Sequence, residues 1–308
     1  MAPIQNSETI SLKDFKPITL EDKPVFDRHY EKYPQVHSDN VFTTMISWME
    51  YGDYHYAHLE DNIVIMTKVN DLIQFRPPIG KRNLDLFNQV FKLALKEASS
   101  PPIALIDVEA KNWLAEKFPK FKFSPDRDYF EYVYLASNLA ELPGTAYAKI
   151  RNRLSKFKKS YAYTIEAISE DNINEVREFL RRWCLWKDCG SDPILENERK
   201  AIVYSMAHFF ELGLSGIAIR INDKIESISV FEKMNGDTAL VHYEKGSPDY
   251  DGIYKPINAQ TAKILQKDFK FINRESDMDL PGLRQAKMSY NPHHMVEVFH
   301  VDRQNMIF

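Results

Sequence analysis

The sequence predicts an α+β protein that contains two similar modules. Strand-like and helix-like segments recur in the same order in the two halves of the 308-residue chain: three meandering strands, a helix, a strand, a helix and a last strand. This length is enough for two domains of roughly 100–200 residues each. We therefore expect a first module over residues 1–142 and a second over residues 143–308, each with a mixed, mainly antiparallel sheet flanked by helices.

The strands of the first module are predicted by short runs of β-branched and aromatic residues between turn pairs. The turn pairs are Asp61-Asn62 and Asn70-Asp71. Apolar residues at helical spacing, from Leu84 to Leu95, predict the first helix after the meander. The expected strands lie at 54–59, 63–68, 72–75, 103–108 and 129–135, and the expected helices at 84–98 and 112–118.

The second module repeats this order, and its strongest turn signal is Asn235-Gly236-Asp237. The expected strands lie at 216–221, 225–233, 238–244, 270–273 and 295–301, and the helices after the meander at 254–267 and 280–288. Two further amphipathic helices, at 170–187 and 192–212, are expected to open this module.

The bulk composition indicates an ordinary globular protein, with 44% apolar and 27% charged residues. A net charge of −4 argues against an extended nucleic-acid-coating surface but allows a local basic patch. The amino-terminal segment does not resemble a signal peptide, and no apolar run approaches the roughly 18 residues that span a bilayer. We expect a cytoplasmic protein without a transmembrane segment, in which Cys184 and Cys189 are ordinary buried thiols.

The segment over residues 271–292 has an unusual density of charge. It is expected to form a strand end, an acidic turn and a helix that Asp279 caps, with Pro281 in the first turn. Arg284 and Lys287 share a face of that helix because they are three residues apart. In a functional interpretation, the acids hold an ammonium group and the bases hold a carboxylate or phosphate; these residues are Glu275, Asp277 and Asp279, and Arg274, Arg284 and Lys287. The alternative is an internal ion-pair network with a helix cap.

The strand at 238–244 carries the candidate general bases. Period-two alternation places Leu240, His242 and Glu244 on one face. Either His242 or Glu244 suits the removal of a proton from an attacking amine, although a lone strand histidine is more often a hydrogen-bonded partner. Tyr254 and Asn258, one turn apart on the next helix, are expected to line the same site, with a core aromatic as the alternative for Tyr254.

A basic amphipathic helix over residues 146–160 links the modules. Its apolar stripe is Ile150, Leu154 and Phe157, and the segment contains no acid. One hypothesis is that Lys149, Arg151, Asn152 and Arg153 contact tRNA phosphates. The alternative is a solvated helix face. No metal site is expected, because His55 and His58 point to opposite faces of a strand and the two cysteines lack a second ligand pair.

Taken together, the repeated order, the basic helix and the 271–292 segment resemble one family, the soluble C-terminal domain of phosphatidylglycerol lysyltransferases. The matching pieces are Arg151-Asn152; Tyr243, Glu244, Gly252 and Tyr254; and Asn273-Arg274-Glu275, Asp277, Gly282-Leu283-Arg284, Lys287, Tyr290 and Pro292. The resemblance implies two tandem acyl-CoA N-acyltransferase (GNAT) modules, as in Fem-type aminoacyltransferases. It also implies a substrate-binding role for Tyr243 and Tyr290. The counterpart of the 271–292 segment in the first module, residues 103–118, is far less charged, and from this asymmetry we expect the active site in the second module.

The resemblance implies transfer of an aminoacyl or acyl group to an amine or hydroxyl by direct attack. The donor is acyl-CoA or aminoacyl-tRNA, and the acceptor is a small molecule, a peptide or a lipid headgroup. The loop at 245–252 contains Pro248, Asp249 and Asp251, which disfavour a cradled pyrophosphate and favour the tRNA ester. The alternative function is a non-catalytic GNAT-fold binding module that has lost its CoA loop.

Overall fold

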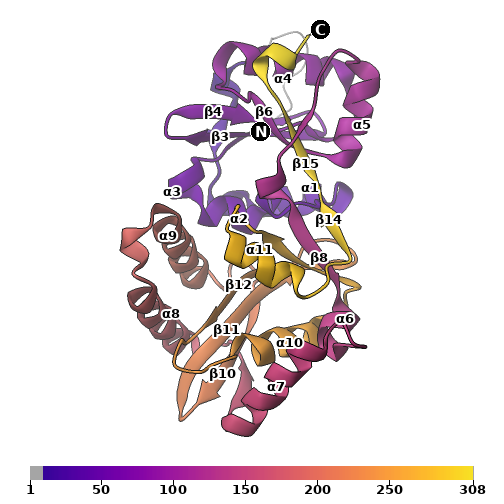
Figure 1. Cartoon of the computed structure of the whole chain (residues 1–308). Helices are drawn as coiled ribbons and strands as arrows, with labels where there is room; N and C mark the ends of the chain where they lie inside the picture. The colour runs from indigo at the N-terminus through magenta and orange to yellow at the C-terminus, as the bar shows by residue number, and fades with distance from the viewer. Residues whose placement is uncertain (1–9, 308) are drawn as a thin grey trace. The chain divides into compact units, whose positions relative to one another are not determined.

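The structure, a computed structural model, describes residues 10–307, and the chain divides into two compact units (Figure 1). The first unit runs to Phe130 and takes up the chain again at Val296, whereas the second is Glu131–Met295. This division does not coincide with the expected boundary between residues 142 and 143. The assignment of GNAT-like modules to 1–142 and 143–308 stays a prediction.

The first unit has a mixed sheet with the strand order β1-β2-β3-β4-β6-β15-β7, with β5 paired to β3. Among the strand pairs of this sheet in the described residues, β4–β6 is the parallel one, with Phe75 opposite Ile103. Its strands are β1 Lys16–Pro17, β2 His55–Leu59, β3 Asn62–Val69, β4 Leu72–Phe75, β5 Ile79–Gly80, β6 Ile103–Asp107, β7 Ser124–Pro125 and β15 Val298–Val301. Its helices are α1 Lys23–Lys32, α2 Phe42–Ser47, α3 Met49–Gly52, α4 Leu84–Glu97 and α5 Val108–Lys117. The expected apolar stripe of α4 lies in the core, where Phe87 and Phe91 are buried.

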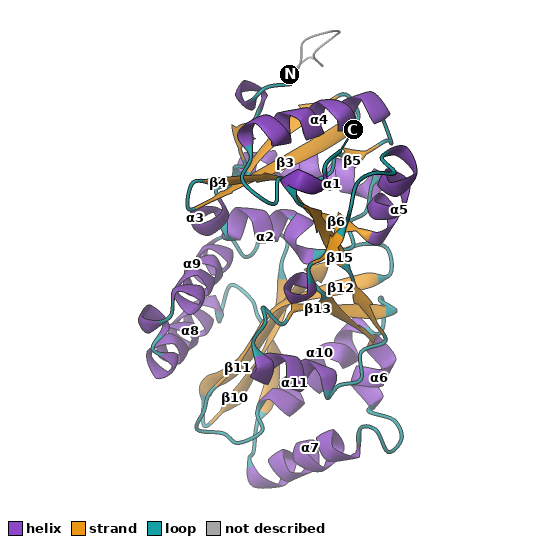
Figure 2. Ribbon diagram, turned by 45° about the horizontal axis from the view of Figure 1, so that its top comes forward, coloured by secondary structure: helices purple, strands orange, loops and turns teal. Residues whose placement is uncertain are grey.

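The second unit has a seven-stranded sheet with the order β14-β8-β13-β12-β11-β10-β9. Its strands are β8 Glu131–Leu135, β9 Thr164–Ala167, β10 Ser215–Ile221, β11 Lys224–Lys233, β12 Thr238–Gly246, β13 Phe271–Ser276 and β14 His294–Val296. Its helices are α6 Ala136–Glu141, α7 Ala148–Ser160, α8 Ile173–Lys187, α9 Pro193–Ala207, α10 Tyr254–Leu265 and α11 Pro281–Met288. Figure 2 shows α8 and α9 on one face of this sheet and α6, α7 and α10 on the other.

The strands expected to close the two modules are exchanged. The strand β8 was expected to end the first sheet, but it pairs with β13 in the second, with Val133 opposite Asn273. The last strand, β15, pairs with β6 in the first sheet, with Phe299 opposite Ile106. The expected placement of both strands is therefore wrong. Residue alternation identifies a strand but does not say which sheet edge it joins.

In the second sheet, β12 and β13 pair only over a short stretch before they part. They are parallel neighbours from Thr238 and Phe271 as far as Leu240 and Asn273. Beyond these residues β12 continues to Gly246 and β13 to Ser276 without pairing with each other. The backbone of β13 turns at Glu275, whose φ is 58° and whose amide donates to Asn273 Oδ1 at 2.8 Å. Several of the polar side chains predicted from the sequence, among them Glu244, Arg274 and Glu275, meet at this junction.

The linking helix α7 is present, and its stripe docks as expected. Ile150 and Phe157 are buried, whereas the basic residues of this helix are exposed. Phe157 packs in edge or tilted contact with Tyr161 and Tyr163, at ring-centroid distances of 4.8 and 5.4 Å. Among the helices in residues 10–307, none combines the length and the apolar content that crossing a bilayer requires.

The two cysteines are joined in a disulfide, so the expectation of ordinary thiols is wrong. Cys184 lies in the last turns of α8, and Cys189 follows the left-handed residue Asp188 that ends this helix. The turn at Asp188 brings the two Cα atoms to 5.2 Å, which is within bonding range. The disulfide therefore closes the corner between α8 and α9.

We predict that Phe157→Ala lowers the free energy of unfolding by about 3–5 kcal/mol, because its ring is fully buried beneath α7. The exposed Ser155→Ala on the same helix is the matched control and should change stability by less than about 0.5 kcal/mol. Urea unfolding followed by circular dichroism measures both. Equal stability of the two variants would show that α7 is not docked through this residue.

Candidate functional site

A β-bulge at His242 separates the two candidate bases. On β11, Val230 lies opposite Tyr243 and the next residue, Phe231, lies opposite Val241, so His242 has no partner on that strand. The bulge interrupts the alternation of side chains. His242 joins one polar cluster and Glu244 joins another, and the expectation that they share a face is wrong.

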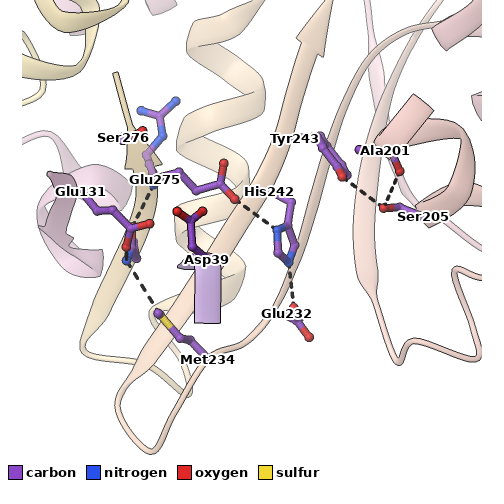
Figure 3. Close-up of polar contacts among 12 residues, drawn as sticks. Asp39, Glu131, Ala201, Ser205, Glu232, Met234, His242, Tyr243, Glu275 and Ser276 are labelled. Atoms are coloured by element: carbon purple, nitrogen blue, oxygen red, sulfur yellow. Dashed lines mark hydrogen bonds and ion pairs between the residues drawn. The ribbon is translucent and has the colours of Figure 1, made fainter. Parts of the chain in front are cut away.

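The first cluster is a buried histidine between two carboxylates (Figure 3). Glu232 Oε1 lies 2.7 Å from His242 Nε2, and Glu275 Oε1 lies 3.2 Å from Nδ1. Burial alone would lower the pKa of His242, but the hydrogen bonds to Glu232 and then Glu275 raise it to about 10. The ring is therefore an imidazolium near neutral pH. Because both its nitrogens carry protons, the geometry gives it the role of holding Glu275 rather than of accepting a proton.

The second cluster centres on an ion pair across the parted strands. Arg274 on β13 donates to Glu244 on β12, and both side chains are largely buried. The guanidinium of Arg274 lies 5.2 Å from the ring centre of Tyr290 and 5.9 Å from that of Tyr134. Burial lowers the pKa of Arg274, but the charge of Glu244 outweighs this and raises it. With its amide turned, the oxygen of Asn258 accepts from Arg274 Nη1 at 2.9 Å.

Lys255, which sequence reasoning did not single out, joins this second cluster from the first turn of α10. Its Nζ donates to the hydroxyl of Tyr290 at 2.9 Å, and no carboxylate in residues 10–307 forms an ion pair with it. Burial, followed by the charges of Arg274 and Arg153, lowers the pKa of Lys255 to about 8. The only sequence signal was its position beside Tyr254, at the start of the helix that follows the expected donor loop.

The remaining charges of the 271–292 segment form an internal network. Lys287 donates to the carbonyl oxygens of Arg274 at 2.7 Å and Glu275 at 3.1 Å, and also to that of Ser276. Asp277 is fully buried and receives two hydrogen bonds from Arg284, both at 2.9 Å, as well as one from Tyr132 at 2.5 Å. These contacts fix the end of β13 and the turn that follows it.

The helix cap predicted in this segment is wrong. The residue before α11 is Leu280, and no side chain caps the helix. Asp279 has a left-handed backbone and accepts from Arg284 at 3.1 Å instead. Pro281 does lie in the first turn, as expected.

The other predicted site residues are divided among different surroundings. Tyr243 is buried, and its hydroxyl lies 3.1 Å from Ser205 Oγ on α9. Tyr254 is 40% exposed, so the alternative of a core aromatic is wrong. Arg151 donates to the carbonyl oxygens of Leu142 and Gly144, which anchors the linker to α7. Lys149, Asn152 and Arg153 are exposed on the same helix.

Within residues 10–307, no group of three or more His, Cys, Asp or Glu side chains is arranged to hold a metal ion. The side chains that meet at the junction are an acid, two basic groups and one tyrosine hydroxyl, namely Glu244, Arg274, Lys255 and Tyr290, beside the ring of Tyr134. Such a set can bind a group that carries both an ammonium and a polarised carbonyl.

Comparison with known proteins decides the family. The family described as phosphatidylglycerol lysyltransferase, C-terminal, matches residues 30–301. The chain belongs to this family. A conserved protein of unknown function from Bacteroides thetaiotaomicron is 30% identical, with 94% of this chain and 98% of that one covered and a TM-score of 0.87.

Two further solved structures share the fold of this phosphatidylglycerol lysyltransferase-type domain. L-PGS from Bacillus licheniformis is 14% identical, with 93% of each chain covered and a TM-score of 0.61. FemX is 10% identical over 94% of this chain and 98% of its own, with a TM-score of 0.55. The expected α+β fold, with two mixed sheets flanked by helices as in Fem-type proteins, is confirmed.

We predict that His242 stays protonated well above neutral pH. Its pKa in the folded protein, about 10, lies above the unperturbed value of about 6.5. The contribution of the protonated ring to the stability of the folded protein is therefore complete below about pH 6.5, and it is lost as the pH rises through about 10. NMR of the labelled imidazole, assigned with His242→Gln, should show no titration between about pH 6 and 8. A midpoint near 6.5 would mean that the ring is neutral above this pH and that the contacts of His242 with Glu232 and Glu275 are not formed.

We also predict that Lys287→Met destabilises the domain by about 2–4 kcal/mol, because several buried carbonyl oxygens lose their donor. Lys263→Met, an exposed change on α10, is the control and should leave stability nearly unchanged. Chemical unfolding compares the two. If Lys287 acts only on a substrate, its replacement will not change the unfolding midpoint.

Proposed function

We propose that this domain transfers an aminoacyl group from aminoacyl-tRNA to an amine or hydroxyl acceptor where β12 and β13 part. The observation that carries the proposal is the Glu244–Arg274 pair, which joins the two strands beyond their last paired residues. Membership in a family described as lysyltransferases supports the reaction class. The acceptor proposed first is a lipid headgroup, with a small-molecule or peptide amine as the alternative.

The polar groups at the junction suit an aminoacyl ester better than a plain acyl group. An aminoacyl ester carries an ammonium next to its carbonyl, and Glu244 and Arg274 offer an acid and a base in one place. We propose that Glu244 binds the ammonium and that Arg274 binds the carbonyl oxygen, whose negative charge grows as the acceptor attacks. The acids Asp249 and Asp251 in the preceding loop disfavour the pyrophosphate of CoA, the alternative donor.

The transfer also needs a group that takes the acceptor's proton. The acceptor nitrogen or oxygen forms a bond to the ester carbonyl carbon, the ester C–O bond breaks, and the terminal ribose oxygen of the tRNA leaves with a proton. Lys255 suits the proton transfer because its pKa is lowered to about 8 and it pairs with no carboxylate in the described chain. We propose Lys255 for this step, in place of the imidazolium His242 and the ion-paired Glu244.

The exposed bases of α7 are proposed to contact the tRNA backbone. Burial, then the charges of Arg274 and Arg153, lower the pKa of Lys255, so Arg153 brings the charge of this helix to the junction. Lys149 and Arg153 are exposed, whereas Arg151 is engaged with the linker carbonyls. Because charged tRNA is a cytoplasmic donor, we also propose a cytoplasmic location.

We predict that Arg274→Gln and Glu244→Gln each lower kcat/KM for transfer by a factor on the order of 100–1,000. The assay follows labelled amino acids from total charged tRNA into dispersed phosphatidylglycerol or into putrescine. The exposed variants Lys263→Gln and Glu211→Gln are matched controls and should retain full activity. Transfer that survives both junction variants places the chemistry elsewhere, and no transfer by the wild type with any acceptor supports the non-catalytic alternative.

The dependence of kcat/KM on pH tests whether Lys255 takes the acceptor's proton. If this amine takes the proton, kcat/KM rises with pH through about 8 in the wild type, because only the neutral form is a base. Lys255→Met should remove that rise and lower kcat while leaving KM nearly unchanged. An identical pH profile in the wild type and the variant would exclude this role.

For tRNA binding, we predict that Lys149→Ala combined with Arg153→Ala weakens affinity and reduces the slope of log K against log salt by about 1 for each lost phosphate contact. A pair of exposed lysines outside α7, Lys263→Ala with Lys267→Ala, gives the same change in net charge. Fluorescence anisotropy with labelled tRNA measures the slopes. Equal slopes in the two double variants would count against contact through α7.

A further inference from the structure

A cavity of about 650 Å³ lies between α8 and α9, a volume typical of pockets that enclose a small organic ligand. Its walls come from these two helices and the disulfide corner that joins them; they are Arg177, Leu180, Arg181, Trp183, Cys184, Leu185, Asp188, Cys189, Gly190, Glu196, Arg199, Ile202, Val203, Met206 and Ala207. None of these residues belongs to β12, β13, α10 or α11. The cavity is therefore separate from the strand junction.

The floor of the cavity is apolar and its rim leaves apolar side chains in water. Leu180, Ile202 and Met206 are buried beneath it. At the opening, Leu185 is 68% exposed and Val203 is 57% exposed. Exposed apolar surface around a hollow favours an apolar ligand, since each Å² removed from water contributes about 25 cal/mol.

The cavity is elongated along the two helices. Its lining on α8 and the corner extends from Arg177 to Asp188, and helical rise over this stretch amounts to about 16 Å. At one end, Arg177 donates to the carbonyl oxygen of Met206 on α9, at 2.6 Å through Nη2. At the other end, the Cys184–Cys189 disulfide closes the corner. This shape fits an extended chain better than a compact ring.

The charged side chains that line the cavity have a small excess of positive charge. Three arginines and two acids line the cavity, which leaves a balance of +1 (three minus two). Arg177 forms no ion pair with any carboxylate in residues 10–307, and its hydrogen bonds to Met206 and Asn174 fix its position. Arg181 pairs with Glu178, but both side chains are more than half exposed, and such a pair contributes little. An anionic head group can therefore replace Glu178 at low cost.

We propose that this cavity binds a single-chain anionic amphiphile of the fatty-acid class. The hydrocarbon chain lies along the floor formed by Leu180, Ile202 and Met206, and the carboxylate pairs with Arg177 and Arg181 at the Arg177 end of the cavity. The cavity shares no residue with the proposed transfer site, so the two proposals can be tested separately.

Isothermal titration with dodecanoate, below its micelle concentration, tests the proposal. We expect saturable binding with one molecule per chain, no binding of dodecyltrimethylammonium, and binding of dodecanol weaker by about tenfold or more, because one charge-assisted contact is lost. Arg177→Gln should bind dodecanoate no better than the wild type binds dodecanol. Met206→Trp should abolish binding by filling the floor, whereas Phe210→Ser, an exposed apolar change outside the cavity, should leave it unchanged.

The proposal is overturned if dodecanoate fails to bind, if the cationic and anionic amphiphiles bind equally, or if Met206→Trp remains folded and binds as tightly as the wild type. Retention on vesicles of anionic phospholipid without binding of monomeric dodecanoate would also overturn it, since that result describes a membrane surface contact. Thermal unfolding of each variant confirms that the fold is intact.

Discussion

The parting of β12 from β13 is the constraint on which the rest of the second unit depends. Once the strands separate, the carbonyl oxygens at the end of β13 lose their neighbours in the sheet, and buried carbonyls without donors are costly. Lys287 supplies that donor from α11, while Asn273 donates to the buried Glu131 on β8 at 2.6 Å. The charge cluster that distinguishes the sequence therefore first serves to keep one strand end away from its neighbour.

This separation gives the adjacent residues of β13 different partners. Arg274 meets Glu244, whereas Glu275 meets His242. The bulge on β12 interrupts the alternation of its side chains, so that His242 and Glu244 face these different partners. A histidine held as an imidazolium between carboxylates is a positioning group, because protonated nitrogens cannot take another proton. The reactive potential of the site therefore rests on the second cluster, where Lys255 has a lowered pKa and Arg274 faces two aromatic rings.

Sequence reasoning predicted local structure well and long-range partners poorly. Residue alternation and helical spacing located strands such as β4 and helices such as α4 and α10, because those patterns arise from burial of one face. The same patterns carry no information on which sheet β8 and β15 join. The bulge at His242 inserts one residue without a sequence signal, so period-two alternation placed His242 and Glu244 together. The importance of Lys255 depends on the distant Tyr290 and Arg153, which only the folded chain brings near.

In the proposed function, the junction of β12 and β13 binds the aminoacyl end of the donor. The most direct measurement is a crystal structure with an amide-linked 3′-aminoacyl-adenosine, which mimics the end of charged tRNA and cannot be transferred. We expect the ammonium to contact Glu244 and the carbonyl oxygen to contact Arg274, with the ion pair between these two side chains opened. An analogue bound elsewhere while the Glu244–Arg274 pair stays closed would contradict it.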